Sequence, residues 1–158
     1  MQISAVFAAL VLAVSARPQS MFRVKATMDY SWEVSEWTGS CPNGSCKYDF
    51  KVTGTENLNG NPKKPGFVAH CAGDTEGTPY RLCDIQDESA TTRRVAAKLQ
   101  PWTTKPANST AARIQVSLQY TDFDTDSMWW NYTGHAETRY TPTPLNFKIT
   151  PDEIYGVA

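Results

Sequence analysis

The sequence lacks the motifs that mark cofactor-dependent enzymes and many serine hydrolases. It has no G-x-S-x-G nucleophile elbow, no glycine-rich loop for a phosphate and no dinucleotide fingerprint. Histidine is scarce, with two residues in a chain of 158. Serine and threonine are plentiful, so composition does not exclude a Ser-His-Asp triad, but nothing singles out one nucleophile. We therefore expect no cofactor.

Long runs of one charge are also missing. The formal net charge is −1, and the basic residues form only isolated doublets such as Lys63-Lys64 and Arg93-Arg94. Binding of nucleic acid through bulk electrostatics is therefore disfavoured. No apolar stretch after residue 16 reaches membrane length, and residues 149–158 lack the hydrophobic tail of a lipid-anchor signal. We expect no membrane insertion.

The first 16 residues predict export from the cell. An almost purely apolar run covers Ile3 to Val14, which is too short to span a bilayer, and Val14-Ser15-Ala16 places small residues where a signal peptidase reads them. A core helix is the alternative, but no amphipathic pattern continues it. We therefore expect a signal peptide at 1–16 and a single secreted, extracellular domain at 17–158.

The four cysteines predict two disulfides, because an exported chain folds in an oxidising environment. Three pairings are possible, and proximity in the chain favours Cys41–Cys46 with Cys71–Cys83. A zinc site is the alternative. The spacings C-x4-C and C-x11-C differ from the paired C-x2-C or H-x3-H patterns of zinc proteins. We therefore expect no metal at these residues.

Apolar and polar residues alternate with the period of a β-strand in several segments. The alternation is clear in Cys46–Val52, Arg113–Tyr120 and Leu145–Thr150. Links rich in Gly, Pro, Asn and Thr separate the segments. The pattern predicts an all-β fold, an antiparallel sandwich or barrel of about seven to eight strands. Weaker strands are expected at Tyr30–Thr38, Gly66–Cys71, Tyr80–Asp84, Arg93–Leu99 and Met128–Tyr140.

The segment between the first two cysteines has the sequence of a hairpin tip. If the cysteines face each other, Trp37 lies opposite Phe50. Trp32 and Val34 then have the wrong parity to continue the same face, unless one extra residue is inserted. We therefore predict a β-bulge near Ser35-Glu36, which sets Val34 opposite Val52.

Three N-x-[ST] sequons occur, at Asn43, Asn108 and Asn131. Each is a glycosylation site only if it is exposed. Asn108, in a polar loop, is the best candidate, and Asn43 lies inside a short disulfide loop.

One segment has the side chains of an acid–base site. In a strand, His135, Glu137 and Arg139 project from one face, and His70 would supply a second histidine. Fungal guanyl-specific ribonucleases build their sites from similar residues on a sheet face. The same face also carries a sequon, however, as an ordinary solvated face does. We expect no catalytic site here.

Two neighbouring segments are candidates for binding. Asp122–Ser127 has carboxylates at the spacing of a calcium loop but lacks the glycine and the glutamate of such a loop. We therefore interpret it as a solvated turn without metal.

In Met128-Trp129-Trp130, alternation predicts that one tryptophan faces outward. That ring could anchor a protein or a glycan, or pack under a loop.

Three motifs resemble a known family: Trp32-Glu33-Val34-Ser35, then Gly66-Phe67-Val68-Ala69-His70-Cys71, then Tyr80-Arg81-Leu82-Cys83. They are similar to small secreted fungal proteins of the Alternaria-major-allergen-like family, which includes plant cell-death elicitors and other effectors. The resemblance implies a β-barrel or sandwich with two disulfides and no established catalytic site. The short Cys41–Cys46 spacing departs from the family pattern, and no functional residue is carried over beyond the cysteines.

These observations predict a secreted, non-enzymatic protein of the effector or elicitor type. It would act by binding a protein or glycan at a host or cell-wall surface, in an oligomeric state that the sequence leaves open. One alternative is an extracellular ribonuclease-like hydrolase using His70, His135, Glu137 and Arg139. The other is a carbohydrate-binding module using Trp129 or Trp130.

Overall fold

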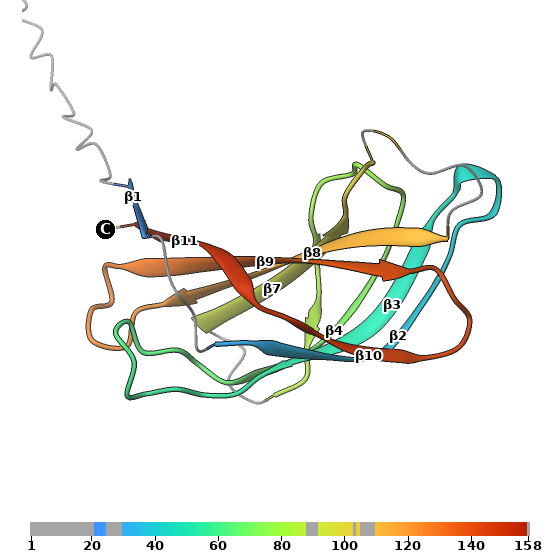
Figure 1. Cartoon of the computed structure of the whole chain (residues 1–158). Coiled ribbons are helices and arrows are strands. Elements are labelled where there is room, and N and C mark those ends of the chain that lie inside the picture. The colour runs from blue at the N-terminus through green and yellow to red at the C-terminus, as the bar shows by residue number, and fades with distance from the viewer. Residues whose placement is uncertain (1–20, 25–29, 88–91, 103, 105–109, 158) are drawn as a thin grey trace, which may run out of the picture.

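The computed structural model describes residues 21–24, 30–87, 92–102, 104 and 110–157 (Figure 1). This part of the chain consists of strands and turns, with one short 3₁₀ turn at Pro42–Gly44. The strands are β1 (Met21–Val24), β2 (Trp32–Ser40), β3 (Lys47–Gly54), β4 (Phe67–Asp74), β5 (Arg81–Leu82), β6 (Asp84–Ile85), β7 (Arg93–Leu99), β8 (Ala111–Thr121), β9 (Trp129–Arg139), β10 (Leu145–Ile149) and β11 (Pro151–Val157).

The strands form two antiparallel sheets. The six-stranded sheet has the order β1-β11-β9-β8-β7-β5, and the five-stranded sheet has the order β10-β2-β3-β4-β6. The chain passes from one sheet to the other between β10 and β11, which are contiguous in Figure 1. The prediction of an all-β antiparallel sandwich with two disulfides is confirmed. Among the described residues, no helix is long and apolar enough to cross a membrane.

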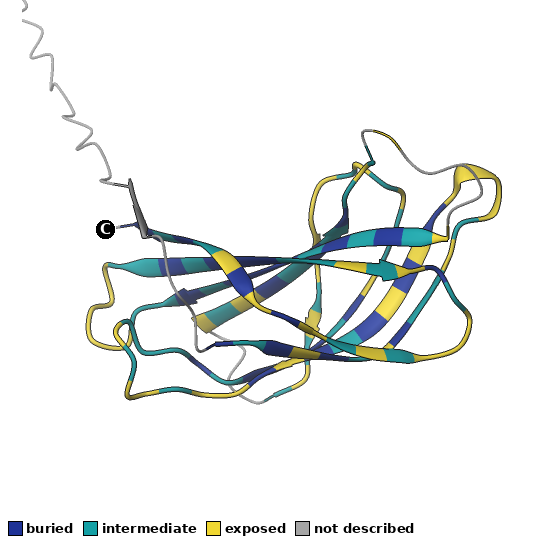
Figure 2. Cartoon of the chain, in the orientation of Figure 1, coloured by how far each residue is buried: buried dark blue, intermediate teal, exposed yellow. Residues whose placement is uncertain are grey.

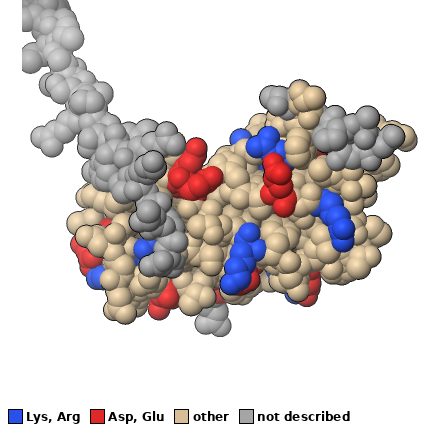
Figure 3. Space-filling view, in the orientation of Figure 1, with Lys and Arg blue, Asp and Glu red and all other residues tan. Residues whose placement is uncertain are grey.

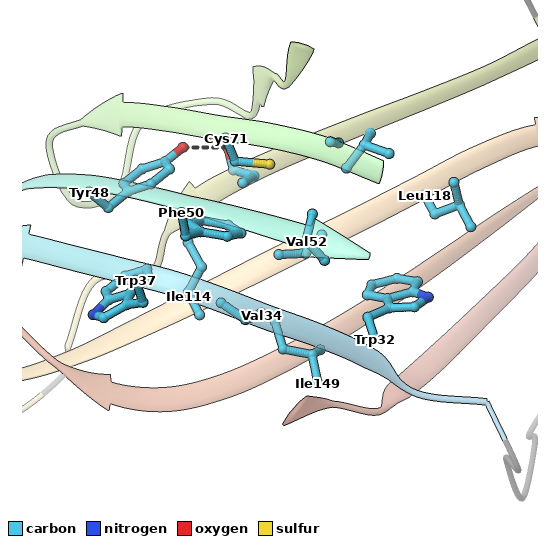
Figure 4. Packing of buried hydrophobic residues seen from close by; sticks show 14 of the residues in the cluster. Trp32, Val34, Trp37, Tyr48, Phe50, Val52, Cys71, Ile114, Leu118 and Ile149 are labelled. Atoms are coloured by element: carbon cyan, nitrogen blue, oxygen red, sulfur yellow. Dashed lines mark hydrogen bonds between the residues drawn. The ribbon is translucent and has the colours of Figure 1, made fainter. Parts of the chain in front are cut away.

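The core lies between the sheets and is built by the alternation read from the sequence. Dark and light bands follow each other along the strands in Figure 2, because every second side chain points inward. Figure 4 shows Trp37, Phe50 and Ile114 packed together, although they come from both sheets. Burial of one such large side chain contributes about 1.5–3 kcal/mol. These aromatic and branched residues therefore hold the two layers together.

The predicted bulge in β2 is confirmed. Val34 pairs with Val52, and the register shifts between Ser35 and Thr38. The shift occurs at Glu36, which has a φ of 57°. Its backbone N–H donates to Asn146 Oδ1 at 3.1 Å instead of joining the ladder. The extra residue returns the strand to the parity that buries both tryptophans of β2.

Both predicted disulfides are present. Cys41–Cys46 closes the β2–β3 hairpin, and Cys71 of β4 is bonded to Cys83. Cys83 stands between β5 of one sheet and β6 of the other. Its backbone N–H donates to Val95 O at 2.8 Å. The second disulfide therefore fastens the segment that crosses between the layers.

Eleven strands are present instead of seven to eight: the one expected at Tyr80–Asp84 is divided at Cys83 into β5 and β6 of different sheets, and β1 and β11 were not foreseen. β11 begins at Pro151 and continues through two acidic residues, which hide its alternation. Its pairing partner on the outer side is β1. Proline is tolerated at the first residue of a strand, where the ladder does not yet need its missing N–H.

Candidate functional site

The outward side of the six-stranded sheet carries rows of polar side chains. Val95, Val116, Tyr132 and their alternating neighbours point into the core, so the residues between them point outward. Three rows cross the sheet there: Arg94–Gln119–Asn131–Tyr155, Ala96–Ser117–Thr133–Glu153 and Lys98–Gln115–His135. We call this surface the outer polar face.

Asn131 organises the middle of this face. Its side-chain oxygen accepts hydrogen bonds from Ser117 Oγ and from Thr133 Oγ1, both at 3.1 Å. Ser117 and Thr133 are only 8% and 5% exposed, although they lie on the outward side. Two adjacent strands, β8 and β9, thus contribute hydroxyl and amide groups to one small cluster that is partly covered.

Tyr80 covers this cluster. The residue precedes β5, at the edge of the sheet, and its hydroxyl lies beside the side chain of Thr133 on β9. Lys98 Nζ lies 4.5 Å from the centre of its ring. The side chain therefore reaches across β7 and β8, where the small residues Ala96 and Ser117 leave room. Burial raises the pKa of the Tyr80 hydroxyl above its usual value of 10.0.

A groove lies at each end of the outer polar face. The first has a volume of about 450 Å³ and is lined by Arg94, Gln119 and Trp129, among others. The second has a volume of about 370 Å³, and its lining includes Lys98 and Arg113. The Tyr80 ring lies beside Thr133, in the row between the one that carries Arg94 and the one that carries Lys98. The face thus offers two recesses with a tyrosine between them.

The two adjacent tryptophans have different surroundings. Trp130 is 7% exposed, and its indole N–H donates to Asp122 Oδ2 at 2.7 Å. It is therefore anchored in the structure and presents little surface to a partner. Trp129 has the opposite parity, lies on the outer polar face beside Val157 and lines the first groove. Trp129 is the ring that a ligand can reach.

The acidic turn after β8 is organised by Asp122. One carboxylate oxygen accepts bonds from the backbone N–H groups of Asp124 and Thr125. Partial burial opposes ionisation of Asp122, but the bonds from Trp130, Asp124 and Thr125 lower its pKa below 3.8. Asp124 forms an ion pair with Lys63 at 2.6 Å. These carboxylates shape and fasten the turn.

The candidate catalytic residues do not converge. His135 projects from β9 of the six-stranded sheet and lies 2.8 Å from Asp152. His70 projects outward from β4 of the five-stranded sheet and lies 3.0 Å from Asp49. Glu137 and Arg139 are exposed on β9. The two histidines are therefore on the outer faces of different sheets, each beside its own carboxylate.

The three sequons differ in their surroundings. Asn43 is exposed in the turn between β2 and β3. Asn131 is partly buried, and its oxygen is engaged by two hydroxyl groups. Asn108 lies outside the described residues.

A larger groove, of about 720 Å³, lies over β2, β3 and β4. Most of its charged lining is paired, since Asp49 contacts His70 and Asp74 contacts Arg81 at 2.6 Å, and Lys47 is its remaining charged group. No aromatic ring on its described lining is exposed, because Tyr48 points into the core. This groove therefore has fewer groups available for a ligand than the outer polar face.

Charge is mixed over the molecule. On the side seen in Figure 3, Lys and Arg alternate with Asp and Glu, and no patch of one sign forms.

Comparisons with protein-family models, curated proteins and solved structures found no match. The site is therefore interpreted from its own chemistry.

The sequence singles out Trp129, Asn131 and His135 on this face, but not the residues around them. The alternation in Arg113–Tyr120 already places Gln115, Ser117 and Gln119 on one polar side. Tyr80 gave no such signal, because its role depends on the spatial order of β5, β7, β8 and β9. Together these residues offer amides, hydroxyl groups and aromatic rings on one rigid surface.

Proposed function

We propose that this protein is a secreted, non-enzymatic binding protein that recognises a glycan at a host or cell-wall surface. The ligand would lie on the outer polar face. The observation that carries the proposal is the position of Trp129, which lines a groove beside the amide of Gln119. Export is supported by the predicted signal peptide and by two disulfides, which persist in oxidising compartments.

Sugars match the chemistry of this surface. A sugar ring has apolar C–H faces that stack on aromatic side chains, and its hydroxyl groups exchange hydrogen bonds with amides. Trp129, Tyr80 and Tyr155 supply rings with accessible area. Gln119 supplies an amide donor and acceptor on strand β8, and Gln115, whose oxygen accepts from Gln100 Nε2, adds its amide N–H groups. Because both kinds of group stand on paired strands, they are held in place before the ligand arrives.

The expected affinity is modest. One aromatic contact adds about 0.5–1.5 kcal/mol beyond its buried area, and each net hydrogen bond adds about the same. A handful of such contacts corresponds to a Kd of roughly 0.1–1 mM. Binding to a polymeric surface would therefore depend on several protein molecules or several sugar repeats acting together.

Replacement of Trp129 tests the proposal. In a glycan-array screen followed by calorimetry, we expect the unmodified protein to bind at least one class of cell-wall or surface glycan. Trp129→Ala should weaken that binding about fivefold to tenfold, because the stacking platform is lost. Phe123→Ala is the matched control: Phe123 is 47% exposed but belongs to the turn after β8. Binding that is equal in all three proteins, or no glycan bound at all, would contradict the proposal.

An elicitor role would be a consequence of this binding at a host surface. Infiltration of the purified protein into leaf tissue should then produce a defence response, and Trp129→Ala should reduce it. A response to Trp129→Ala as strong as that to the unmodified protein would separate elicitation from the outer polar face.

A further inference from the structure

We infer that the glycan is an acidic one, whose carboxylate groups are bound by the cations at the two ends of the outer polar face. This inference rests on the proposed function, since it names the ligand class of the same site. The cations are Arg94 in the first groove and Lys98 with Arg113 in the second.

The first groove combines a ring with a guanidinium. Arg94 is exposed on β7 and pairs in register with Gln119 of β8, and Trp129 lines the same recess. No acidic residue is found among the described residues that line this groove. A sugar ring stacked on Trp129 would hold its carboxylate within reach of the Arg94 guanidinium, which binds carboxylates through two parallel N–H groups.

The second groove also carries positive charge. Lys98 Nζ lies 4.5 Å from the centre of the Tyr80 ring. Arg113 Cζ lies 5.4 Å from the centre of the Trp102 ring. The described lining again contains no carboxylate. Glu137 is 3.8 Å from Arg113, but its side chain is 72% exposed, so water screens the pair and leaves Arg113 able to bind an anion.

The two ends are spaced for a chain rather than for a single sugar. Arg94 and Lys98 are on the same strand and have the same parity, which separates them by about 13 Å at roughly 3.3 Å per residue. The Ala96–Ser117–Thr133 row, with the Tyr80 ring beside it, lies between the rows that carry these two cations. A short oligosaccharide can contact both cations and the polar groups between them.

A carboxylated glycan fits this face better than a denser polyanion does. Glu153 of β11 belongs to the outer polar face, and Glu137 lies close to one of its ends. The protein as a whole has a net charge of −1. A ligand with closely spaced phosphates or sulfates would be repelled by these carboxylates, whereas a polymer with one carboxylate per sugar can place its charges on the cations alone.

The inference is tested with four probes and the full-length secreted protein. The probes are polygalacturonate, its methyl-esterified form, dextran sulfate and single-stranded RNA, with binding measured by calorimetry. We expect polygalacturonate to bind most tightly, and esterification to weaken binding about tenfold because charge-assisted hydrogen bonds are lost. Arg94→Gln and Lys98→Gln should each weaken binding to polygalacturonate by a similar factor, and added salt should weaken it further.

Lys148→Gln is the matched control, because Lys148 is an exposed lysine on β10 of the other sheet, paired with Glu33. It should leave binding unchanged. Equal binding of the two galacturonate polymers, with Trp129→Ala still deficient, would overturn the acidic ligand and leave the proposed function standing. Tighter binding of dextran sulfate or RNA than of polygalacturonate would also overturn it. Failure to bind any glycan would remove the proposed function and this inference together.

Discussion

At the scale of single residues, several side chains act through their hydrogen bonds rather than through exposed chemistry. Asp122 shows this clearly. Its two oxygens accept bonds from two backbone N–H groups, from Thr125 Oγ1 and from the Trp130 indole. A carboxylate at the first position of a possible metal loop thus fixes a turn and a buried tryptophan. The sequence indicated an ordinary solvated turn, and the geometry gives this carboxylate a structural role.

Replacement of Asp122 by alanine should destabilise the protein by about 1–2 kcal/mol, because several donors lose their acceptor. The loss should also depend on pH. The pKa of Asp122 in the folded state lies below 3.8. Its contribution is therefore fully present above the unfolded-state pKa, and it is lost as pH falls below about 4. Urea unfolding of both proteins at several pH values measures this.

The difference in stability between the two proteins should shrink as the pH falls from 5 to 2.5, roughly the range over which such carboxylates titrate. A difference that stays constant over this range would show that the charge of Asp122 contributes nothing to the turn.

At the scale of the element, the sequence predicted the pairing of a strand best where two independent constraints acted on that strand. The cysteines fixed the register at the hairpin tip, and the buried tryptophans fixed the parity further along β2. Together they required the extra residue at Glu36. Strands with one constraint were harder to foresee: β11 lacks clear alternation because Pro151 is followed by two acidic residues, and its pairing with β9 depends on the whole sheet.

The bulge makes a prediction about Glu36. A φ of 57° favours glycine. Glu36→Gly should therefore be neutral or stabilise the protein by up to about 1 kcal/mol, since the exposed ion pair with Lys51 contributes little. Glu36→Pro should destabilise it by about 3 kcal/mol or more, because proline cannot adopt this φ and has no N–H for Asn146.

Thermal unfolding monitored by circular dichroism separates the two variants of Glu36. Ser35→Gly is a control, because its position pairs normally with Lys51. If proline were tolerated at Glu36 as well as glycine is, the positive φ would not be a requirement of the strand.

At the scale of the whole molecule, fold and site differ in how far the sequence predicts them. Period-two alternation is a local signal, so the layers, the core and the polar side of β8 could be read from it. The outer polar face needs four strands in the right order and a tyrosine from the edge of the sheet. That arrangement comes from long-range pairing, and so Tyr80 and the two grooves became visible only in three dimensions.

The packing between the layers also sets the behaviour of the molecule at high pH. Burial raises the pKa of Tyr30 and of Tyr48 to about 12. Tyr48 lies in the core and donates to Ala97 O at 3.0 Å, across the sandwich (Figure 4). Because the folded-state pKa is raised, the stabilisation is complete below the unfolded-state value of 10.0 and is lost as pH rises toward 12.

We therefore expect the contribution of these tyrosines to be constant from neutral pH up to about pH 10, and stability to fall steeply above it, as buried hydroxyl groups ionise only with unfolding. Urea unfolding across this range, with tyrosinate absorbance recorded in parallel, measures both events. Tyr48→Phe should be less stable at pH 7 because Ala97 O loses its donor, and its stability should fall less steeply above pH 10. Tyrosinate absorbance that rises fully before unfolding begins would show that these hydroxyl groups are accessible to hydroxide in the folded sandwich.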